Sequence, residues 1–313
     1  MRLLYDEALG GICIQRCYGL DGKIQLPEEV EGRPVKELAA YVFSDTVRGR
    51  EVPPEAYEGE EGLYGVRVRE LTLPPQVAKV GAYAFYNCFN LTRLSFCSTV
   101  EDWGAGVFTG CTGITELDIR IVPGRKSCFK EVLSELHQTL AVDYRDELGN
   151  LQARLIFPEY FEESVENTPA RIIMREMHGC GHIYRYSFAG SVFDFAEYDR
   201  LFPLVQVQEK PGLVTRLALY RLYWSHGLTE TAGQEYWGYL LAHVREGTAG
   251  LMERQEEDIL RWMAQDVHTG AAELDSMLAA AAAANSAPCC AFLMDVKHRR
   301  FPAGKERKRT FEL

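Results

Sequence analysis

The chain lacks the two kinds of segment that would place it in or across a membrane. Its start, from Met1 to Glu7, has neither the basic segment nor the run of about 7–15 apolar residues of a signal peptide. No stretch approaches the roughly 20 apolar residues that a membrane-spanning helix needs. We therefore expect a cytoplasmic protein that inserts into no membrane.

Positive charge is also in short supply. Lys and Arg number 34 among 313 residues, against 45 Asp and Glu, which gives a formal net charge of −11. Phosphate binding draws its affinity from clustered Lys and Arg that release counterions. The composition therefore argues against a nucleic-acid partner and against an anionic membrane surface.

A disulfide framework is missing as well. The nine cysteines are odd in number and irregularly spaced. This usage is typical of reduced thiols in a reducing compartment.

What the sequence does have is an internal repeat. Seven positions between Leu71 and Leu91 recur one period later, and the first two recur once more. The period is about 23 residues, and solenoid coils with an L-x-L core have periods of about 20–29 residues. No nucleophile motif, metal box or phosphate-binding loop accompanies the repeat, so no cofactor is expected. The matched positions are Leu71, Leu73, Val77, Val80, Phe85, Cys88 and Leu91, then Leu94, Phe96, Val100, Trp103, Phe108, Cys111 and Ile114, then Leu117 and Ile119.

A looser copy of the pattern precedes the repeat, from Leu26 to Phe43. Leu26 lies about two periods before its counterpart Leu73, so the coil between them is either degenerate or replaced by an insertion. Residues 45–65 hold a Pro-Pro pair, several Gly and a run of Glu, the composition of a solvated loop. We favour the insertion and expect it to be mobile.

The segment from Leu73 to Leu91 resembles the BspA-like class of bacterial leucine-rich repeats, whose coils read roughly L-P-x-x-V-x-x-I-G-x-x-A-F-x-x-C-x-x-L. Gly32-Arg33-Pro34-Val35 is similar to the step that opens such arrays, and the coil at Trp103-Gly104 departs from the usual Ile-Gly. The resemblance covers about residues 10 to 120. It implies a recognition scaffold and, as the alternative to the cytoplasm, a place at the cell surface.

After Ile121 the period stops and the pattern predicts a mixed α+β segment. Ser127 to Gln138 has apolar residues at helical spacing, which predicts a helix that closes the open end of the solenoid. Residues 140–157 alternate around the turn Asp146 to Asn150 and predict a β-hairpin. Phe193 to Phe202 predicts a helix that packs into the core.

From about Asp194 the chain turns helical. Five short helices joined by tight turns suggest stacked helix pairs, and the last pair weakly resembles an ankyrin-type pair without its T-P-L-H opening. The predicted helices are Leu213 to Trp224, Thr229 to Arg245, Leu251 to Gln265, Ala271 to Ala284 and Pro288 to His298, with Gly212, Gly227, Gly247, Gly250 and Gly270 as punctuation.

His178, Cys180 and His182 are residue types that bind zinc. Three ligands so close together in the chain rarely fit one tetrahedron, and the sequence points to no fourth. We interpret the stretch as a Gly-rich turn that leads into a strand from Ile183 to Phe188. A metal-binding or enzyme module around these three residues and Asp199 is the alternative.

The sequence thus predicts an α+β protein in three parts. A leucine-rich-repeat solenoid spans 1–122 with an insertion at about 45–65, a capping helix, β-hairpin and mixed segment span 123–205, and a helical domain of helix-pair repeats spans 206–313. The favoured function is non-catalytic recognition of an unknown protein partner, or an adaptor role in which the solenoid and the helical domain hold different partners. The expected contact residues on the sheet are Thr72, Arg93, Ser95, Glu116 and Asp118.

Overall fold

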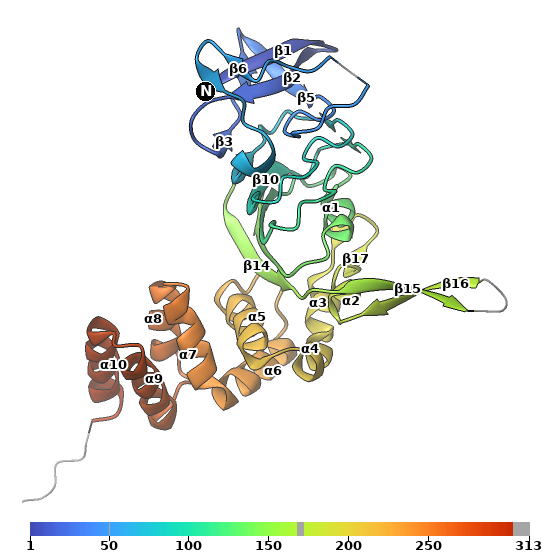
Figure 1. The fold of residues 1–313 in the computed structure, drawn as a ribbon. Coiled ribbons are helices and arrows are strands. Elements are labelled where there is room, and N and C mark those ends of the chain that lie inside the picture. The colour runs from blue at the N-terminus through green and yellow to red at the C-terminus, as the bar shows by residue number, and fades with distance from the viewer. Residues whose placement is uncertain (50, 168–171, 303–313) are drawn as a thin grey trace, which may run out of the picture. The chain divides into compact units, whose positions relative to one another are not determined.

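The computed structural model describes residues 1–49, 51–167 and 172–302 (Figure 1). It divides into two compact units, 1–208 and 209–313. The first unit holds a β-solenoid followed by a mixed segment, and the second is a helical array, so the protein is α+β. The expected segments 1–122 and 123–205 lie together in the first unit.

The larger sheet of the solenoid has six strands in the order β14-β13-β12-β10-β8-β3. The parallel strands β8, β10 and β12 pair Leu71 with Leu94 and Leu94 with Leu117, which are the residues that recur in the sequence. The repeat is therefore the length of one coil, and the predicted solenoid is confirmed. The strands are β3 (Lys23–Gln25), β8 (Glu70–Thr72), β10 (Arg93–Cys97), β12 (Glu116–Arg120), β13 (Leu140–Arg145) and β14 (Leu151–Phe157).

The looser N-terminal copy joins the same sheet, because β3 pairs directly with β8 and places Ile24 opposite Leu71. Between Phe43 and β8, the chain contains β6 (Ala56–Tyr57), β7 (Glu60–Glu61) and the 3-10 turn η1 (Gly65–Arg67). Backbone hydrogen bonds from Leu63 to Cys17 and from Gly19 to Glu61, of 2.8 and 3.0 Å, hold this segment against residues 17–19 near the N-terminus.

A second sheet forms the opposite side of the coils, in the order β1-β2-β5-β9-β11 with β4 beside β5. Its first two strands form an antiparallel hairpin that the repeat pattern did not predict, and its later strands are parallel. The strands are β1 (Arg2–Ala8), β2 (Gly11–Tyr18), β4 (Glu29–Val30), β5 (Arg33–Leu38), β9 (Lys79–Val80) and β11 (Asp102–Trp103).

The core lies between these sheets and is stacked coil upon coil. Phe43, Phe85 and Phe108 occupy equivalent positions in consecutive coils, with ring centroids 5.9 and 5.8 Å apart. All three are buried, as are the leucines of the strands. A coil cannot bury this face alone, so each one depends on its neighbours.

The solenoid ends differently from the prediction. The predicted helix is present as α1 (Phe129–Glu135), and the predicted hairpin is β13 and β14. However, β13 also pairs in parallel with β12, where Leu117 faces Val142. The sheet thus continues for one more coil, with α1 in its return segment, and the antiparallel β14 forms its edge.

The strand predicted from Ile183 to Phe188 is wrong, because α2 (Gly181–Tyr184) is a helical turn there. This turn positions the buried Arg185, whose guanidinium donates hydrogen bonds to the carbonyls of Leu136 and Gly181 at 2.8 and 2.9 Å. A side chain at Gly181 would place its Cβ 2.0 Å from the Pro158 carbonyl oxygen. Tight packing and a buried cation therefore override the strand-like sequence pattern.

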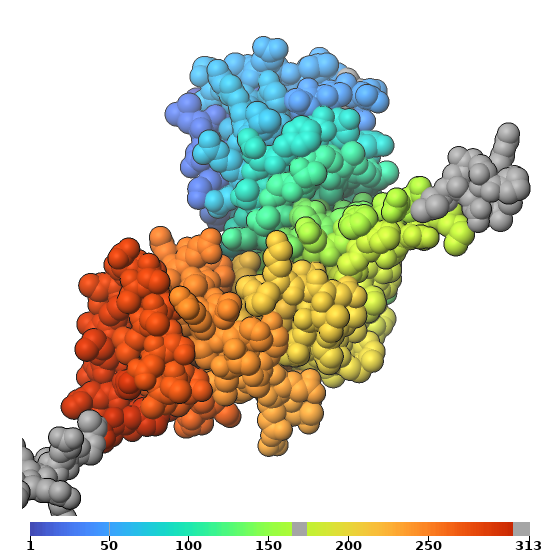
Figure 2. All heavy atoms as spheres, turned by 60° about the horizontal axis from the view of Figure 1, so that its bottom comes forward, coloured from blue at the N-terminus to red at the C-terminus, as the bar shows by residue number. Residues whose placement is uncertain are grey.

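Two hairpins and two helices complete the first unit. The hairpin of β15 and β16 extends away from the rest of this unit (Figure 2). The predicted helix from Phe193 to Phe202 is divided in two at Leu201, and its buried Tyr198 hydroxyl donates to the Ile156 carbonyl at 2.6 Å. These elements are β15 (Phe161–Asn167), β16 (Ile172–His178), β17 (Phe188–Ala189), β18 (Val192–Phe193), α3 (Phe195–Arg200) and α4 (Phe202–Gln208).

The second unit has six helices within residues 209–302, one more than predicted. α5 packs on α6 and α7, α7 packs on α9, and α9 packs on α10. The additional helix, α7, runs through Gly247 and Gly250, so reading these glycines as punctuation was wrong. The helices are α5 (Pro211–Tyr223), α6 (Glu230–Ala242), α7 (Val244–Glu253), α8 (Glu257–Gln265), α9 (Ala271–Ala283) and α10 (Ala287–Arg300).

Candidate functional site

The outward face of the six-stranded sheet brings together the residues that the sequence predicted as contacts. Because side chains alternate along a strand, the inward leucines leave their neighbours facing out. Strand register sets these neighbours in two rows. One row contains Lys23, Glu70, Arg93 and Glu116, and the other contains Gln25, Thr72, Ser95, Asp118, Asp143 and Arg154.

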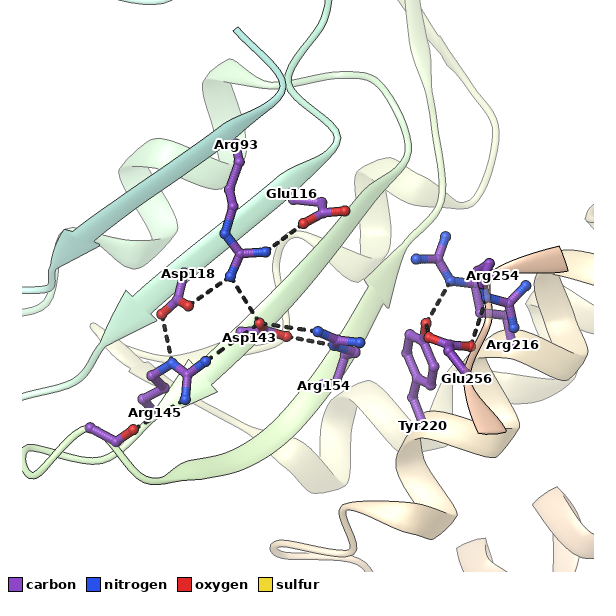
Figure 3. A network of polar contacts seen from close by, with 11 residues as sticks. Arg93, Glu116, Asp118, Asp143, Arg145, Arg154, Arg216, Tyr220, Arg254 and Glu256 are labelled. Carbon is purple, nitrogen blue, oxygen red and sulfur yellow. Dashed lines mark hydrogen bonds and ion pairs between the residues drawn. The ribbon is translucent and has the colours of Figure 1, made fainter. Parts of the chain in front are cut away.

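Asp143 of β13 is the centre of an ion-pair network on this face (Figure 3). Its Oδ1 accepts from Nε of Arg154 at 2.6 Å, and its Oδ2 accepts from Nη2 of Arg154 and Nη2 of Arg93, both at 3.2 Å. Its side chain is 5% exposed. Asp143 is thus a nearly buried carboxylate held by cations from two other strands.

Asp118 of β12 is the second junction of the network. It accepts from Arg93 Nη2 and from Arg145 Nε, both at 2.8 Å. Arg93 also pairs with Glu116, so this one arginine of β10 contacts carboxylates on both β12 and β13. Neighbouring strands lie about 4.8 Å apart, so a long arginine side chain reaches across the next strand to the one beyond it. The network therefore links three parallel strands and β14.

The electrostatics keep these groups charged. Burial alone would raise the pKa of Asp143, but the hydrogen bonds and charges of Arg154 and Arg93 hold it below its ordinary value. Burial would likewise lower the pKa of Arg93, and the carboxylates of Glu116, Asp143 and Asp118 raise it instead. A general base works best with a pKa near the working pH. The pKa of Asp143 is shifted the other way, away from the range in which a general base works best near neutral pH.

The structure places the five predicted residues unequally. Arg93, Glu116 and Asp118 enter the network, whereas Thr72 and Ser95 lie beside it, in the same row as Asp118. Sequence reasoning missed Asp143, Arg145 and Arg154. The alternation of the predicted hairpin already turned these three outward, but the parallel pairing of β13 with β12 was not foreseen.

The residues of the alternative module do not converge. His178 stacks on Phe161, with centroids 4.6 Å apart, and its Nε2 lies 3.2 Å from Glu163. His182 contacts the rings of Tyr160 and Tyr186, and Cys180 is buried. Within the described residues, no group of three or more His, Cys, Asp or Glu is arranged to hold a metal ion.

A separate polar cluster lies within the helical unit (Figure 3). The Tyr220 hydroxyl of α5 donates to Glu256, which also accepts from Arg254 Nε at 2.8 Å. Arg216 Nε donates to the same hydroxyl at 3.2 Å. Since Arg254 and Glu256 lie in the turn between α7 and α8, the cluster ties that turn to α5.

No helix in the described part of the chain combines the length and the apolar character that crossing a membrane requires.

Comparison with known proteins agrees with the coil geometry. Residues 59–139 match the family model described as "BspA type Leucine rich repeat region (6 copies)". Searches of curated proteins and of solved structures found no match. The matched segment contains the strands β8, β10 and β12, whose register places each repeated leucine beside its counterpart in the next coil. Residues 59–139 are therefore a leucine-rich-repeat region of the BspA type.

Proposed function

We propose that this chain is a non-catalytic recognition or scaffold protein that binds a protein partner through the outward face of its six-stranded sheet. Thr72, Arg93, Ser95, Glu116 and Asp118 are the proposed contact residues. The observation that carries the proposal is the ion-pair network, which fixes charged side chains on a sheet face before any partner is present.

Preorganisation of this kind favours binding. Ordering a long, flexible side chain at an interface costs about 0.5–1.5 kcal/mol, and the network has already ordered Arg93 and Arg145. Arginine is also enriched among the residues that dominate binding energy. Each arginine of the network is more than a quarter exposed, so it keeps edges available to a partner's acceptors.

The network also supplies specificity. It combines three arginines with the carboxylates of Glu116, Asp118 and Asp143, so its net charge is zero. A partner would therefore recognise where each charge lies on the face rather than an overall charge. Complementary patterns of this kind exclude wrong partners more than they raise affinity. The short side chains of Thr72 and Ser95 allow a partner to approach the sheet closely. We extend the proposal to the helical unit as a second contact, because a solenoid with so few coils offers a small surface.

We infer a reducing compartment, such as the cytoplasm, as the location. The nine cysteines all lie within the described residues and form no disulfide there, and six of them are buried. Proteins of oxidising compartments typically pair their cysteines.

The proposal is tested with one substitution on the sheet face and one matched control. Thr72→Arg places a large cation on the face, and Thr112→Arg makes the same change at an exposed threonine in a turn of the solenoid. Tagged full-length chains are used for quantitative affinity purification from the source cells. We expect a protein that wild type and Thr112→Arg retain equally and that Thr72→Arg retains at least tenfold less.

Equal retention by all three chains would move the contact surface away from this face. Recovery of no protein above an unrelated acidic control protein would count against recognition as the function.

A further inference from the structure

The two sheets of the solenoid end at different coils. The six-stranded sheet continues past β12 into β13 and β14, whereas the other sheet ends at β11 in the described part of the chain. Beside β11, where one more strand of this sheet would lie, the chain places residues 125–128 and the helix α1. The coil from Glu101 to Gly110 therefore has a neighbour on one side and an open edge on the other.

Hydrogen bonds between the preceding coils show which backbone groups face that edge. Tyr83 and Phe85 donate their N–H groups forward to Ala105 and Val107, at 3.0 and 3.3 Å. In the opposite direction, the carbonyl of Val80 accepts from Gly104 at 2.8 Å. Each coil thus offers a fixed set of N–H and C=O groups to the coil that follows it.

One period later, the following coil contributes no strand on this side that pairs with the same groups in the described part of the chain. The equivalents are the N–H groups of Gly106 and Phe108, the N–H of Gly110 one step further along, and the carbonyls of Glu101 and Trp103. Among the described residues, no backbone hydrogen bond is made by these five groups. An edge with spaced donors and acceptors is a template for an added strand.

A groove lies beside Glu101, Trp103 and Phe108 of this edge. It has a volume of about 550 Å³ and runs between the coil and α1. Trp103, Val107 and Phe108 line it from the coil, and Val132 lines it from the helix. Pockets that take small ligands span about 300–1,000 Å³, so this groove admits several side chains of an extended segment.

The charge around the groove is unbalanced. Four carboxylates line it, against the two cations Arg125 and Lys126. Arg125 pairs with Glu101 at 2.9 Å, and Lys126 pairs with Glu131 at 3.2 Å. Both lining cations are therefore already matched by a carboxylate.

The surplus negative charge belongs to Asp102 and Glu135, one on each side of the groove. Asp102 lies 3.9 Å from Lys79 of the preceding coil, a long and exposed contact that contributes little. These two carboxylates are therefore the groups of the groove that a basic ligand would meet.

We propose that this groove binds an extended segment of a partner protein that alternates basic and apolar residues. The segment adds a strand to the open coil edge, places apolar side chains against Trp103 and Phe108, and brings basic side chains to Asp102 and Glu135. The site is distinct from the outward face of the six-stranded sheet and does not depend on the function proposed for that face.

The test uses the full-length chain and a short fluorescent peptide in which lysine alternates with valine. Anisotropy titrations compare wild type with the double variant Asp102→Lys/Glu135→Lys. The matched control is Glu147→Lys/Glu159→Lys, which makes the same change of charge at two exposed carboxylates of the first unit. We expect at least tenfold weaker binding to the groove variant and unchanged binding to the control.

Two further measurements separate strand addition from simple charge attraction. A peptide with N-methylated valines cannot pair along its backbone, and we expect it to bind at least tenfold more weakly. Amide hydrogen exchange at Gly106, Phe108 and Gly110 should slow when the unmodified peptide is bound. Equal binding of both peptides, or unchanged exchange at these amides, would overturn the proposal.

The other possible occupant is a second copy of the chain. Sedimentation analysis of wild type that shows a dimer lost in the Asp102→Lys/Glu135→Lys variant would identify that copy as the occupant and overturn the proposal. A monomer in both chains is the expected result.

Discussion

The thiol of Cys111 donates a hydrogen bond to the backbone carbonyl of Phe85, 3.1 Å away in the preceding coil. Cys88 makes the equivalent bond to the carbonyl of Phe43, at 3.2 Å. Cysteine packs as a small apolar residue and also carries a weak donor, so it satisfies a buried carbonyl at little cost in space. This explains why cysteine recurs with the period of the coil.

The first prediction concerns thiol reactivity. Burial raises the pKa of Cys17, Cys111 and Cys128 to about 12, and the thiolate is the reactive form. We expect iodoacetamide at pH 8 to modify the half-buried Cys289 and Cys290 first and these three only on unfolding. Peptide mapping by mass spectrometry over time checks the order. Early labelling of Cys111 in the folded chain would contradict the coil packing.

The second prediction concerns the aromatic stack. Phe85→Ala and Phe108→Ala should each lower the free energy of unfolding by about 3–5 kcal/mol, the range for deleting a buried aromatic ring. Both rings are almost completely buried, whereas Thr72 is exposed. Thr72→Ala should therefore leave stability nearly unchanged. Chemical denaturation measures all three, and Phe variants within error of wild type would refute the coil register.

The third prediction concerns Asp143 and pH. Its pKa in the folded chain lies below the ordinary value of 3.8, so its charge stabilises the fold above that pH. This contribution is lost as the pH falls through the folded pKa. Asp143→Asn should lower the free energy of unfolding by about 1–3 kcal/mol at pH 7, because it removes the charge-assisted hydrogen bonds that Arg93 and Arg154 donate to the carboxylate.

Urea denaturation at pH 7 and at pH 3 tests this sign. The difference between wild type and Asp143→Asn should shrink at pH 3, because the stabilisation by the charged carboxylate diminishes progressively once the pH falls below the ordinary aspartate pKa of 3.8. The exposed Asp6, changed to Asn, serves as the control with little effect at either pH. A difference that grows as the pH falls would mean that the network does not stabilise the charged form.

The fourth prediction concerns the two glycines inside α7. A Cβ at Gly247 would lie 3.1 Å from Leu240 Cδ1 and 3.7 Å from Leu219 Cδ1, because α7 packs closely there. Gly247→Leu should therefore destabilise the helical unit by about 1–3 kcal/mol. At Gly250 the nearest atom is the flexible end of Arg254, so Gly250→Ala should stabilise the helix by about 0.5–1 kcal/mol. Thermal melts of both variants distinguish the positions, and equal effects would argue against this packing.

The elements whose pattern is local were predictable from the sequence. The strands around Leu71, Leu94 and Leu117 follow from the period, and the hairpin of β13 and β14 follows from strict alternation around a turn. Failures occurred where tertiary packing overrode the local signal. Ile183 lies in a helical turn because Arg185 must reach buried carbonyls, and Gly247 lies inside a helix because a neighbouring helix packs against it.

The candidate site was predictable only in part. Arg93, Glu116 and Asp118 sit one period apart or two positions along a strand, so the repeat alone turns them to one face. Asp143 was missed because Leu117 pairs with Val142, which lies beyond the position that the period specifies.

By itself, the sequence determined the coil length and the inward and outward assignment of the repeated positions, because a periodic chain carries that information in every coil. Tertiary structure alone decided where each sheet ends, which charges meet at Asp143, and that a groove remains beside α1. These outcomes depend on register between segments that do not share the period and on how far long side chains reach across strands. Neither the register between these segments nor the reach of these side chains can be read from a local stretch of the chain.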